Sequence, residues 1–213
     1  MAHQAARLMY AAVLCAGTAL AQAIEFESNG LRFQTLTRDG VTIMFAPLPV
    51  QVRDYAVLQV AVSNGSPSTR TVKPEDFRFI REDGSKVPAA PARQVVKEFL
   101  DKGGRSDVIK LVTTYEMSLY GVGRIKSTNG YEVRRQQYLA EMTSAKLKAA
   151  AAASAIAFIP TTLKPGESTD GAIFFPMQGR PLTAGKLVAT PGSAQFEFEV
   201  GGLRHPGELI RRP

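Results

Sequence analysis

The sequence predicts a mainly β protein, an antiparallel β-sandwich that carries a block of helices between two of its strands. Short stretches of alternating apolar and polar residues are separated by turn residues about every 8–12 positions, which is typical of sandwiches. The middle of the chain instead repeats its apolar residues with the period of a helix. Strand patterns then resume. We therefore expect one sandwich domain from 24–92 and 156–200, a helical insertion over 93–155 and a tail over 201–213.

The strands of the first flank are predicted between clear turn signals. Residues 31–37 alternate in polarity, and Asp39-Gly40, a dipeptide common in β-hairpins, leads into a second strand over 41–45. The segment 46–49 contains two prolines, which predicts the end of that strand because proline has no backbone N–H to donate. Three further strands are predicted in this flank, over 55–63, 77–81 and 86–87.

The middle of the chain is predicted to form three helices. The first covers 93–102 and ends at Gly103-Gly104. The second begins at Ser106, a favourable N-cap residue, and continues to Leu119. The third covers 131 to about 155 without a break and ends in a run of alanines, the best helix formers.

The second flank returns to strand patterns. An extended segment over 156–163 is followed by Pro165-Gly166, which is typical of a type II turn. Phenylalanine and valine then alternate with glutamate in the last predicted strand, which indicates a sheet with one exposed face. The strands predicted after the turn cover 171–175, 186–190 and 195–200.

The order of these turn and core patterns resembles that of bacterial secreted immunoglobulin-like domains of unknown function. The resemblance rests on a strand that ends in Asn64, a later strand followed by Asp83-Gly84, and two segments after the helices, 163–167 and 171–176. It implies an immunoglobulin-like sandwich that acts as a binding module in the cell envelope or outside the cell. It implies no catalytic residues, and the helical block departs from the compact form of that family.

The first 23 residues predict an export signal. Arg7 supplies the positive charge, residues 8–20 are mostly apolar, and Ala21-Gln22-Ala23 matches a signal-peptidase site. We therefore expect a mature chain that begins at Ile24 and works in the periplasm or outside the cell. Lipid attachment at Cys15 is disfavoured because Leu14 precedes it, where a lipobox has a small residue.

The residues of the expected mature chain do not point to an enzyme. It has no cysteine and one histidine, His205, which lies beside a proline in the predicted tail. No histidine pair has zinc spacing, and Asp39, Asp83 and Asp170 each adjoin a glycine as turn residues do. Gly121 and Gly123 lack the third glycine of a dinucleotide-binding loop. We expect no catalytic residue, metal or cofactor.

The best functional signal is the basic, tyrosine-rich composition of the helical block. Residues 93–150 contain 11 Lys and Arg against 6 Asp and Glu, whereas the flanks are nearly neutral. Tyrosine and arginine are enriched in protein interfaces. Four of them share one predicted helical face, at i, i+3, i+4 and i+7: Tyr131, Arg134, Arg135 and Tyr138.

Two functions remain open on these observations. The leading hypothesis is a non-enzymatic binding module whose helical face contacts an acidic protein, an anionic envelope polymer or a lipid headgroup. The alternative is an envelope component that self-associates through the small-residue run 149–159, if that run is exposed. The same tyrosines could instead pack the helices onto the sandwich. Nucleic acid is disfavoured as a partner because the chain is expected to be exported and its basic residues are interspersed with acids.

Overall fold

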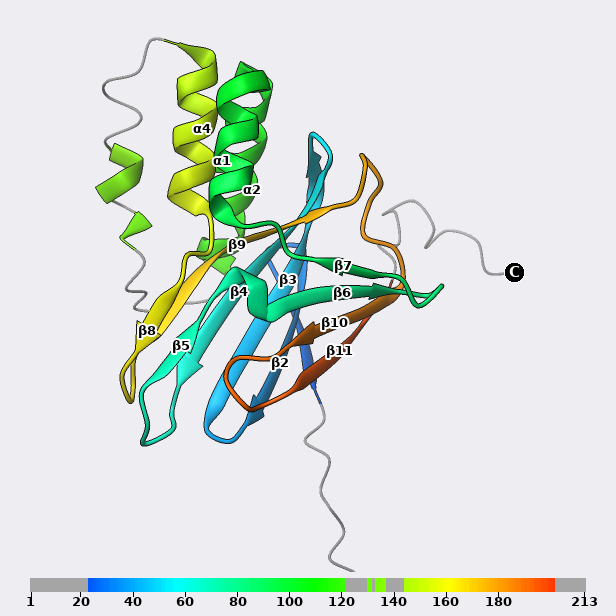
Figure 1. The fold of residues 1–213 in the computed structure, drawn as a ribbon, viewed down its shortest axis with the longest axis vertical. Coiled ribbons are helices and arrows are strands. Elements are labelled where there is room, and N and C mark those ends of the chain that lie inside the picture. The colour runs from blue at the N-terminus through cyan, green and yellow to red at the C-terminus, as the bar shows by residue number, and fades with distance from the viewer. Residues whose placement is uncertain (1–22, 122–129, 132, 137–143, 202–213) are drawn as a thin grey trace, which may run out of the picture.

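A computed structural model describes residues 23–121, 130–131, 133–136 and 144–201. The predicted export signal, Cys15, Tyr138 and the tail histidine His205 lie outside the described residues. The described chain consists of antiparallel sheets packed face to face, with three helices standing side by side at one end of them (Figure 1). The predicted fold class of a mainly β, sandwich-like protein with helices between its strands is therefore confirmed.

The larger sheet has five strands and the smaller sheet has four, and every strand pair within them is antiparallel. In spatial order, the larger sheet is formed by β1 (Ile24–Ser28), β2 (Leu31–Arg38), β3 (Val41–Val52), β4 (Tyr55–Asn64) and β9 (Ser168–Pro176). The smaller sheet is formed by β11 (Phe196–Val200), β10 (Gly185–Ala189), β6 (Phe77–Arg81) and β7 (Lys86–Pro88). A separate pair joins β5 (Arg70–Val72) to β8 (Thr161–Leu163).

Strands that follow the helices pair with strands that precede them. β9 pairs with β4 along its whole length, and β10 pairs with β6. The helices therefore interrupt the sequence of the sandwich without dividing its sheets. They are α1 (Ala92–Lys102), α2 (Arg105–Gly121) and α4 (Ala145–Ile156), and a short 3₁₀ turn, η1 (Pro74–Asp76), precedes β6.

Two hydrophobic cores lie on opposite faces of the larger sheet. Between the sheets, Phe45 meets Phe198 edge to face with ring centroids 4.9 Å apart. On the other face, Tyr55 and Phe174 pack beneath the helices with ring centroids 5.8 Å apart. Because side chains alternate along a strand, β4 supplies Leu58 to the first core and Val57 to the second.

The buried side chain of Asn64 joins two loops at one end of the sandwich, the loop that follows β4 and the turn that follows β8. Its Nδ2 donates to the backbone oxygens of Ser68, at 2.8 Å, and Leu163, at 2.9 Å. Its Oδ1 accepts from the backbone N–H and the hydroxyl of Ser66. The Asn64 backbone also bonds to the turn that contains Gly166, whose φ of 82° suits glycine. Asn64 and the turn at Gly166, which are two parts of the sequence pattern described above, are therefore adjacent in space.

Three sequence predictions about element boundaries were wrong. β3 continues through Pro47 to Val52, with a shift of register in β3 between Pro47 and Gln51. The second helix begins at Arg105 rather than after Ser106, and the Asp107 carboxylate accepts the backbone N–H of Gly104 instead. The long third helix is interrupted, since Ser144 has extended backbone angles and α4 starts after it.

The segment after α4 also differs from its prediction. Residues 156–163 were expected to be extended, but α4 includes Ile156 and the strand covers only Thr161–Leu163. The linker between them passes close to β9, where a Cβ on Gly171 would lie 2.6 Å from Cα of Phe158. This close approach explains why glycine occupies that position in an otherwise apolar strand.

Candidate functional site

The structure turns part of the predicted tyrosine-arginine face inward. Tyr131 is 5% exposed, and its ring packs edge to face on Tyr115 of α2 with centroids 4.9 Å apart. Its hydroxyl donates to Oε1 of Glu116 at 3.0 Å. Tyr131 therefore packs the helices together in this structure.

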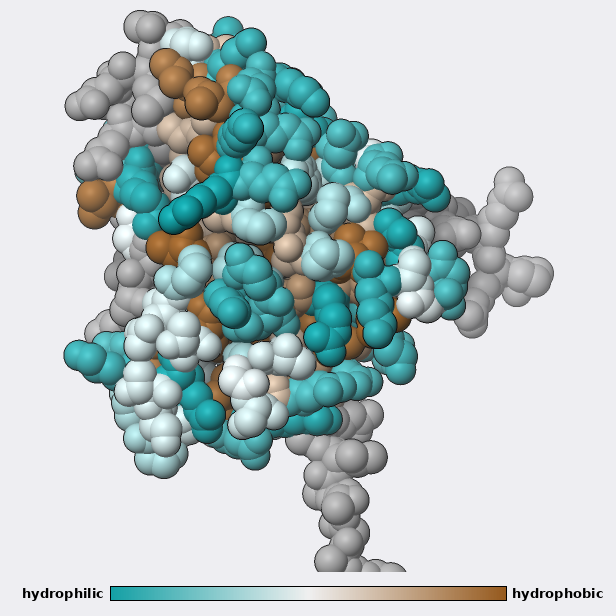
Figure 2. All heavy atoms as spheres, viewed as in Figure 1, coloured by the Kyte–Doolittle hydropathy of each residue, from teal (hydrophilic) through white to brown (hydrophobic). Residues whose placement is uncertain are grey.

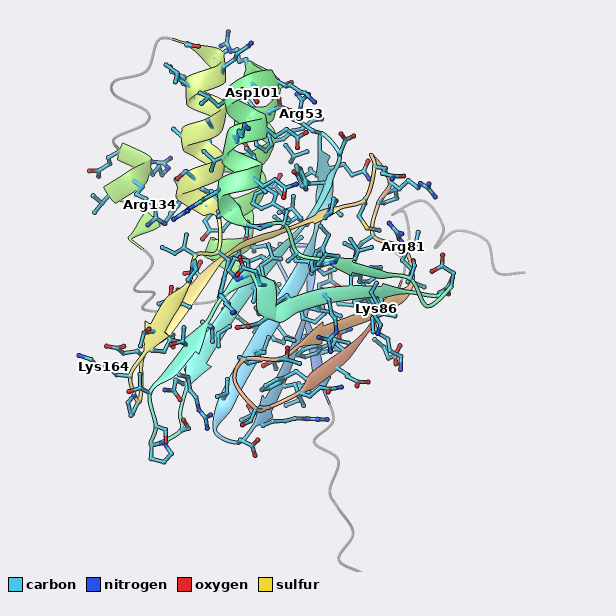
Figure 3. The ribbon with its side chains drawn as sticks, in the orientation of Figure 1. Arg53, Arg81, Lys86, Asp101, Arg134 and Lys164 are labelled. Carbon is cyan, nitrogen blue, oxygen red and sulfur yellow. The ribbon has the colours of Figure 1, made fainter. Side chains whose placement is uncertain are left out.

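The two arginines of that face also make contacts within the protein. Nε of Arg135 donates to Oε1 of Glu116 in a short ion pair. Nη2 of Arg134 donates to the backbone oxygen of Ala155 at 2.8 Å, so its side chain reaches the end of α4 (Figure 3). Both are partly buried, and Tyr138 is not among the described residues. A role for these four residues in partner binding stays a prediction.

A buried carboxylate links the larger sheet to α2. Asp170 on β9 is 3% exposed, and its Oδ2 accepts from the hydroxyl of Tyr115 at 2.7 Å. Nε2 of Gln59 on β4 donates to the same oxygen at 3.1 Å. Burial of a carboxylate lowers the stability of the fold unless hydrogen bonds satisfy it, and these two donors do so. Because Tyr115 must reach Asp170, the bond also fixes the position of α2 on the sheet. The sequence suggested only a turn role for Asp170, so this prediction was wrong.

Arg53 ties the β3–β4 hairpin to the helices. Its Nη1 donates to the backbone oxygen of Lys102 at 2.8 Å and lies 3.4 Å from Oδ2 of Asp107. Its Nε lies 3.8 Å from Oε1 of Glu98, which is an ion pair without a hydrogen bond. Figure 3 shows Arg53 at the tip of the hairpin beside α1. The residue adopts a backbone φ of 57°, which is uncommon for residues other than glycine, asparagine and aspartate.

Glu98 also accepts a hydrogen bond from the hydroxyl of Tyr55 at 2.7 Å. Burial of the phenol, together with the Glu98 carboxylate, raises the pKa of Tyr55 above its usual value. The phenol therefore stays protonated and acts as a donor throughout the physiological pH range. The cluster of Tyr55, Glu98 and Arg53 holds α1 to the sheet, and its polar groups contact one another.

The small-residue run at the end of the insertion is buried. Ala149, Ala152 and Ala153 are fully buried between α1, α2 and the sheet, and Ile156 and Phe158 are 1% exposed. The chain approaches this run closely at Gly103, which follows α1, because a Cβ on Gly103 would lie 2.7 Å from Cβ of Ala149. The run is therefore not available for contacts between copies, and self-association loses the surface that suggested it.

The exposed side of the helices combines apolar side chains with lysine and arginine. Among the side chains that the structure describes, each helix exposes one large apolar residue: Leu100 on α1 is 45% exposed, Ile109 on α2 is 56% exposed, and Leu147 on α4 is 46% exposed. Basic residues at adjacent, i−3 or i−4 positions flank all three: Lys97, Arg105, Lys110, Lys146 and Lys148. Figure 2 shows hydrophobic atoms over the upper turns of α4.

Internal ion pairs leave this surface more positive than the composition of the helices suggests. α1, α2 and α4 carry seven Lys and Arg and four Asp and Glu. Glu98, Asp107 and Glu116 pair with Arg53 or Arg135, which lie outside these three helices. Asp101 is the exposed acid that remains on them (Figure 3). We call the exposed residues of α1, α2 and α4 the helical surface.

Sequence analysis identified the basic character of this block, including Lys97, Lys102, Lys146 and Lys148, but it did not identify the exposed apolar residues beside them. The signal was available in part, because Lys97 lies on the opposite side of α1 from the buried Val95 and Phe99, and Leu100 lies at the edge of their stripe. The sequence pattern alone would group Leu100 with the apolar stripe of Val95, Val96 and Phe99, but the structure exposes it. Periodicity shows which residues share a face, but a residue at the edge of a stripe can lie on either side of the boundary.

Two searches of the described residues have simple outcomes. They contain no group of three or more histidine, cysteine, aspartate or glutamate side chains placed to hold a metal ion. None of the helices in this part of the chain is both long and apolar enough to cross a membrane.

Comparison with known proteins adds little to this description. Neither a protein-family model nor a curated protein sequence matches the chain. One similar solved structure is that of the yjhA protein from Bacillus subtilis, which is 10% identical and has a TM-score of 0.32. The similarity covers 79% of this chain and 78% of that one. A similarity at this level carries no argument about fold or function.

Proposed function

We propose that the protein is an exported, non-enzymatic binding module and that its helical surface docks on an acidic partner protein. The observation that carries the proposal is the set of exposed apolar side chains on the three helices, Leu100, Ile109 and Leu147, each flanked by basic residues. Apolar anchors surrounded by charge are typical of protein interfaces, where the anchors supply affinity and the charges supply steering.

The chemistry of the helical surface favours a protein partner over a lipid surface. A helix that lies in a membrane interface has one continuous apolar face turned to the lipid. Here the apolar faces of α1 and α4 are turned toward the sheet and toward one another, and Leu100, Ile109 and Leu147 are separated by polar and charged positions. Isolated anchors of this kind suit pockets on a protein better than a hydrocarbon layer.

The proposal includes an immunoglobulin-like sandwich as the scaffold and a site of action in the periplasm or outside the cell. The motifs around Asn64 and Gly166 and the signal-like residues 1–23 support these parts. An Ile24–Pro213 mature chain would present the helical surface on a rigid base, because the helices share a core with the larger sheet.

Deletion of the insertion is not a suitable test, because the apolar face of the larger sheet would lose its cover. We therefore design a surface variant that combines Lys97→Glu, Leu100→Ser and Lys102→Glu. The matched control combines Lys86→Glu with Lys164→Glu, two exposed lysines away from the helices (Figure 3). Both variants must melt within a few degrees of the wild type before they are used.

The measurement is capture from an envelope extract, followed by carbodiimide cross-linking, which joins lysine amines to carboxylates in direct contact. We expect an acidic protein that cross-links to Lys97 or Lys102, is released by salt, and is captured at least about tenfold less by the surface variant. The control should capture it as the wild type does. Equal capture by the two variants, or cross-links confined to the sheets, would refute the proposal.

A further inference from the structure

A groove of about 550 Å³ opens beside the β3–β4 hairpin, apart from the residues used in the proposed docking test. One wall is the proline-containing part of β3, and the other is the Pro181–Ala184 segment that connects β9 to β10. Figure 1 shows this connection rising beside the hairpin. Lys110 of α2 stands at the groove. Its volume is within the range of sites that bind small molecules.

The groove exists because β3 separates from its neighbours over a short stretch. The pairing of β2 with β3 ends at Phe45, and the pairing of β3 with β4 is interrupted between Pro47 and Gln51. Across this gap, β4 contributes only Val57 opposite three residues of β3. Such a bulge bends the strand and exposes side chains that a regular ladder would cover.

The lining is apolar and reaches both cores of the protein. Leu48 and Val57 belong to the core beneath the helices, whereas Ala56 and Leu182 belong to the core between the sheets. Prolines contribute rigid apolar surface on both walls of the groove. A ligand with a hydrocarbon body would therefore be desolvated against a preformed surface, which favours binding.

Of the polar side chains that line the groove, one has a hydrogen-bond donor that no described residue pairs and another has a positive charge. Nε2 of Gln51 is buried and has no hydrogen-bond partner among the described residues. Buried donors are nearly always paired, so a rotation of the Gln51 side chain that brings this amide to the groove would let it donate to an acceptor that the protein does not supply. Lys110 is exposed, forms no ion pair with a described carboxylate, and is the only charged residue in the lining.

We propose that this groove binds a small amphipathic carboxylate, with its alkyl body against Leu48, Val57 and Leu182 and its carboxylate between Lys110 and Gln51. A carboxylate has two acceptor oxygens, so one can accept from the amide while the other pairs with the ammonium group. A neutral alcohol would satisfy only one of these groups, and an alkylammonium would repel Lys110.

The proposal is tested with a series of alkyl carboxylates, each below its micelle concentration, by isothermal titration calorimetry on the protein lacking residues 1–23. The probes are octanoate, decanoate and dodecanoate, with decanol and decylammonium as headgroup controls. Each methylene that the groove buries should increase affinity about fourfold, until the chain exceeds the groove. Decanoate should bind more tightly than either control.

Three variants identify the site of binding. Lys110→Gln should weaken decanoate binding about tenfold, because a charge-assisted contact is lost. Thr183→Phe should block the groove with an exposed position of its wall and abolish binding. Lys146→Gln, which removes an exposed lysine of α4 outside the groove, should have no effect. All three should melt like the wild type, since the substituted side chains are exposed.

Several results would overturn the proposal. They are no binding of any carboxylate by the wild type at millimolar concentration, equal affinity for decanoate and decanol, or unchanged binding by Lys110→Gln or Thr183→Phe. None of these results bears on docking at Lys97 and Leu100, so the two proposals fail or succeed separately.

Discussion

Replacement of Asn64 tests whether one buried side chain holds two loops of the sandwich together. In the wild type, its amide makes two donor and two acceptor bonds, all between 2.6 and 3.1 Å, and the residue is fully buried. Asn64→Ala removes all four and leaves the Leu163 carbonyl without this donor. With about 1 kcal/mol for each net bond, and some relief because Ser66 also donates to Ser68, we expect a loss of about 2–4 kcal/mol.

Asn64→Asp removes the donor group of the side chain but keeps its shape. It therefore separates the effect of the lost hydrogen bonds from the effect of lost packing. A carboxylate still accepts from Ser66, but its second oxygen now faces the carbonyl oxygens of Ser68 and Leu163. Repulsion and burial should raise the pKa of the new carboxyl above that of the unfolded chain. The variant is then most destabilised above this raised pKa, by about 3–5 kcal/mol, and it recovers stability as the pH falls through it.

Urea denaturation at several pH values measures both effects, and Ser66→Ala serves as the milder control. The free energy of unfolding of Asn64→Ala should be lower by a similar amount at each pH, whereas that of Asn64→Asp should approach the wild type in acid. For a domain of this size, 3 kcal/mol corresponds to a fall of roughly 6–12 °C in Tm. A loss below about 1 kcal/mol for Asn64→Ala, or a pH-independent Asn64→Asp, would refute the reasoning.

Three further predictions concern single positions. Arg53→Gly removes the bonds to the helices but relieves the φ of 57°, so it should lower the free energy of unfolding by about 1–2 kcal/mol, less in high salt, as measured by urea titration. Gly171→Ala forces the linker at Phe158 away from β9 and should cost about 1–3 kcal/mol in the same assay. Burial raises the pKa of Asp76, so the charged form opposes folding. Asp76→Asn should therefore stabilise the fold increasingly as the pH rises through the acid range, with no gain below the unfolded pKa.

The strands could be predicted where local chemistry determines them. Asp39 and Gly40 both adopt positive φ, at 49° and 74°, as the hairpin that their sequence indicated requires. β11 alternates buried and exposed side chains along its length. The first strand, Ile24–Ser28, was missed although Asn29-Gly30 gives an equally strong hairpin signal and Phe26 alternates with two glutamates.

Local rules failed where distant neighbours decide the outcome. Two prolines predicted the end of a strand, but β3 continues past them because β2 no longer flanks it there and β4 alone pairs with it. Tyr131 could be assigned to a helical face, but its burial depends on Tyr115, which is 16 positions earlier. The groove was not predictable either, since Lys110, Gln51 and Leu182 meet only in the folded chain.

The composition of β4 shows why the helices are part of the folding unit. In a two-layer sandwich, the outer face of a central strand is exposed to solvent and alternate residues are polar. Here Ala56, Leu58 and Val60 face the other sheet, and Tyr55 and Val57 face the helices with almost no exposure. Loss of the helices would expose both, together with Phe33 of β2 and Phe174 of β9, so the larger sheet needs its helical cover.

The helices and the sheets should therefore unfold in one transition. Circular dichroism at the helix band and infrared absorption at the β-sheet band should give the same thermal midpoint, and the calorimetric and van't Hoff enthalpies should agree. The Tyr115–Asp170 bond and the Arg53 contacts couple the layers, so Tyr115→Phe should shift both probes together. A helix signal lost at a lower temperature than the β-sheet signal would show that the helices unfold independently of the sheets, and the docking surface would then lie on a separable layer.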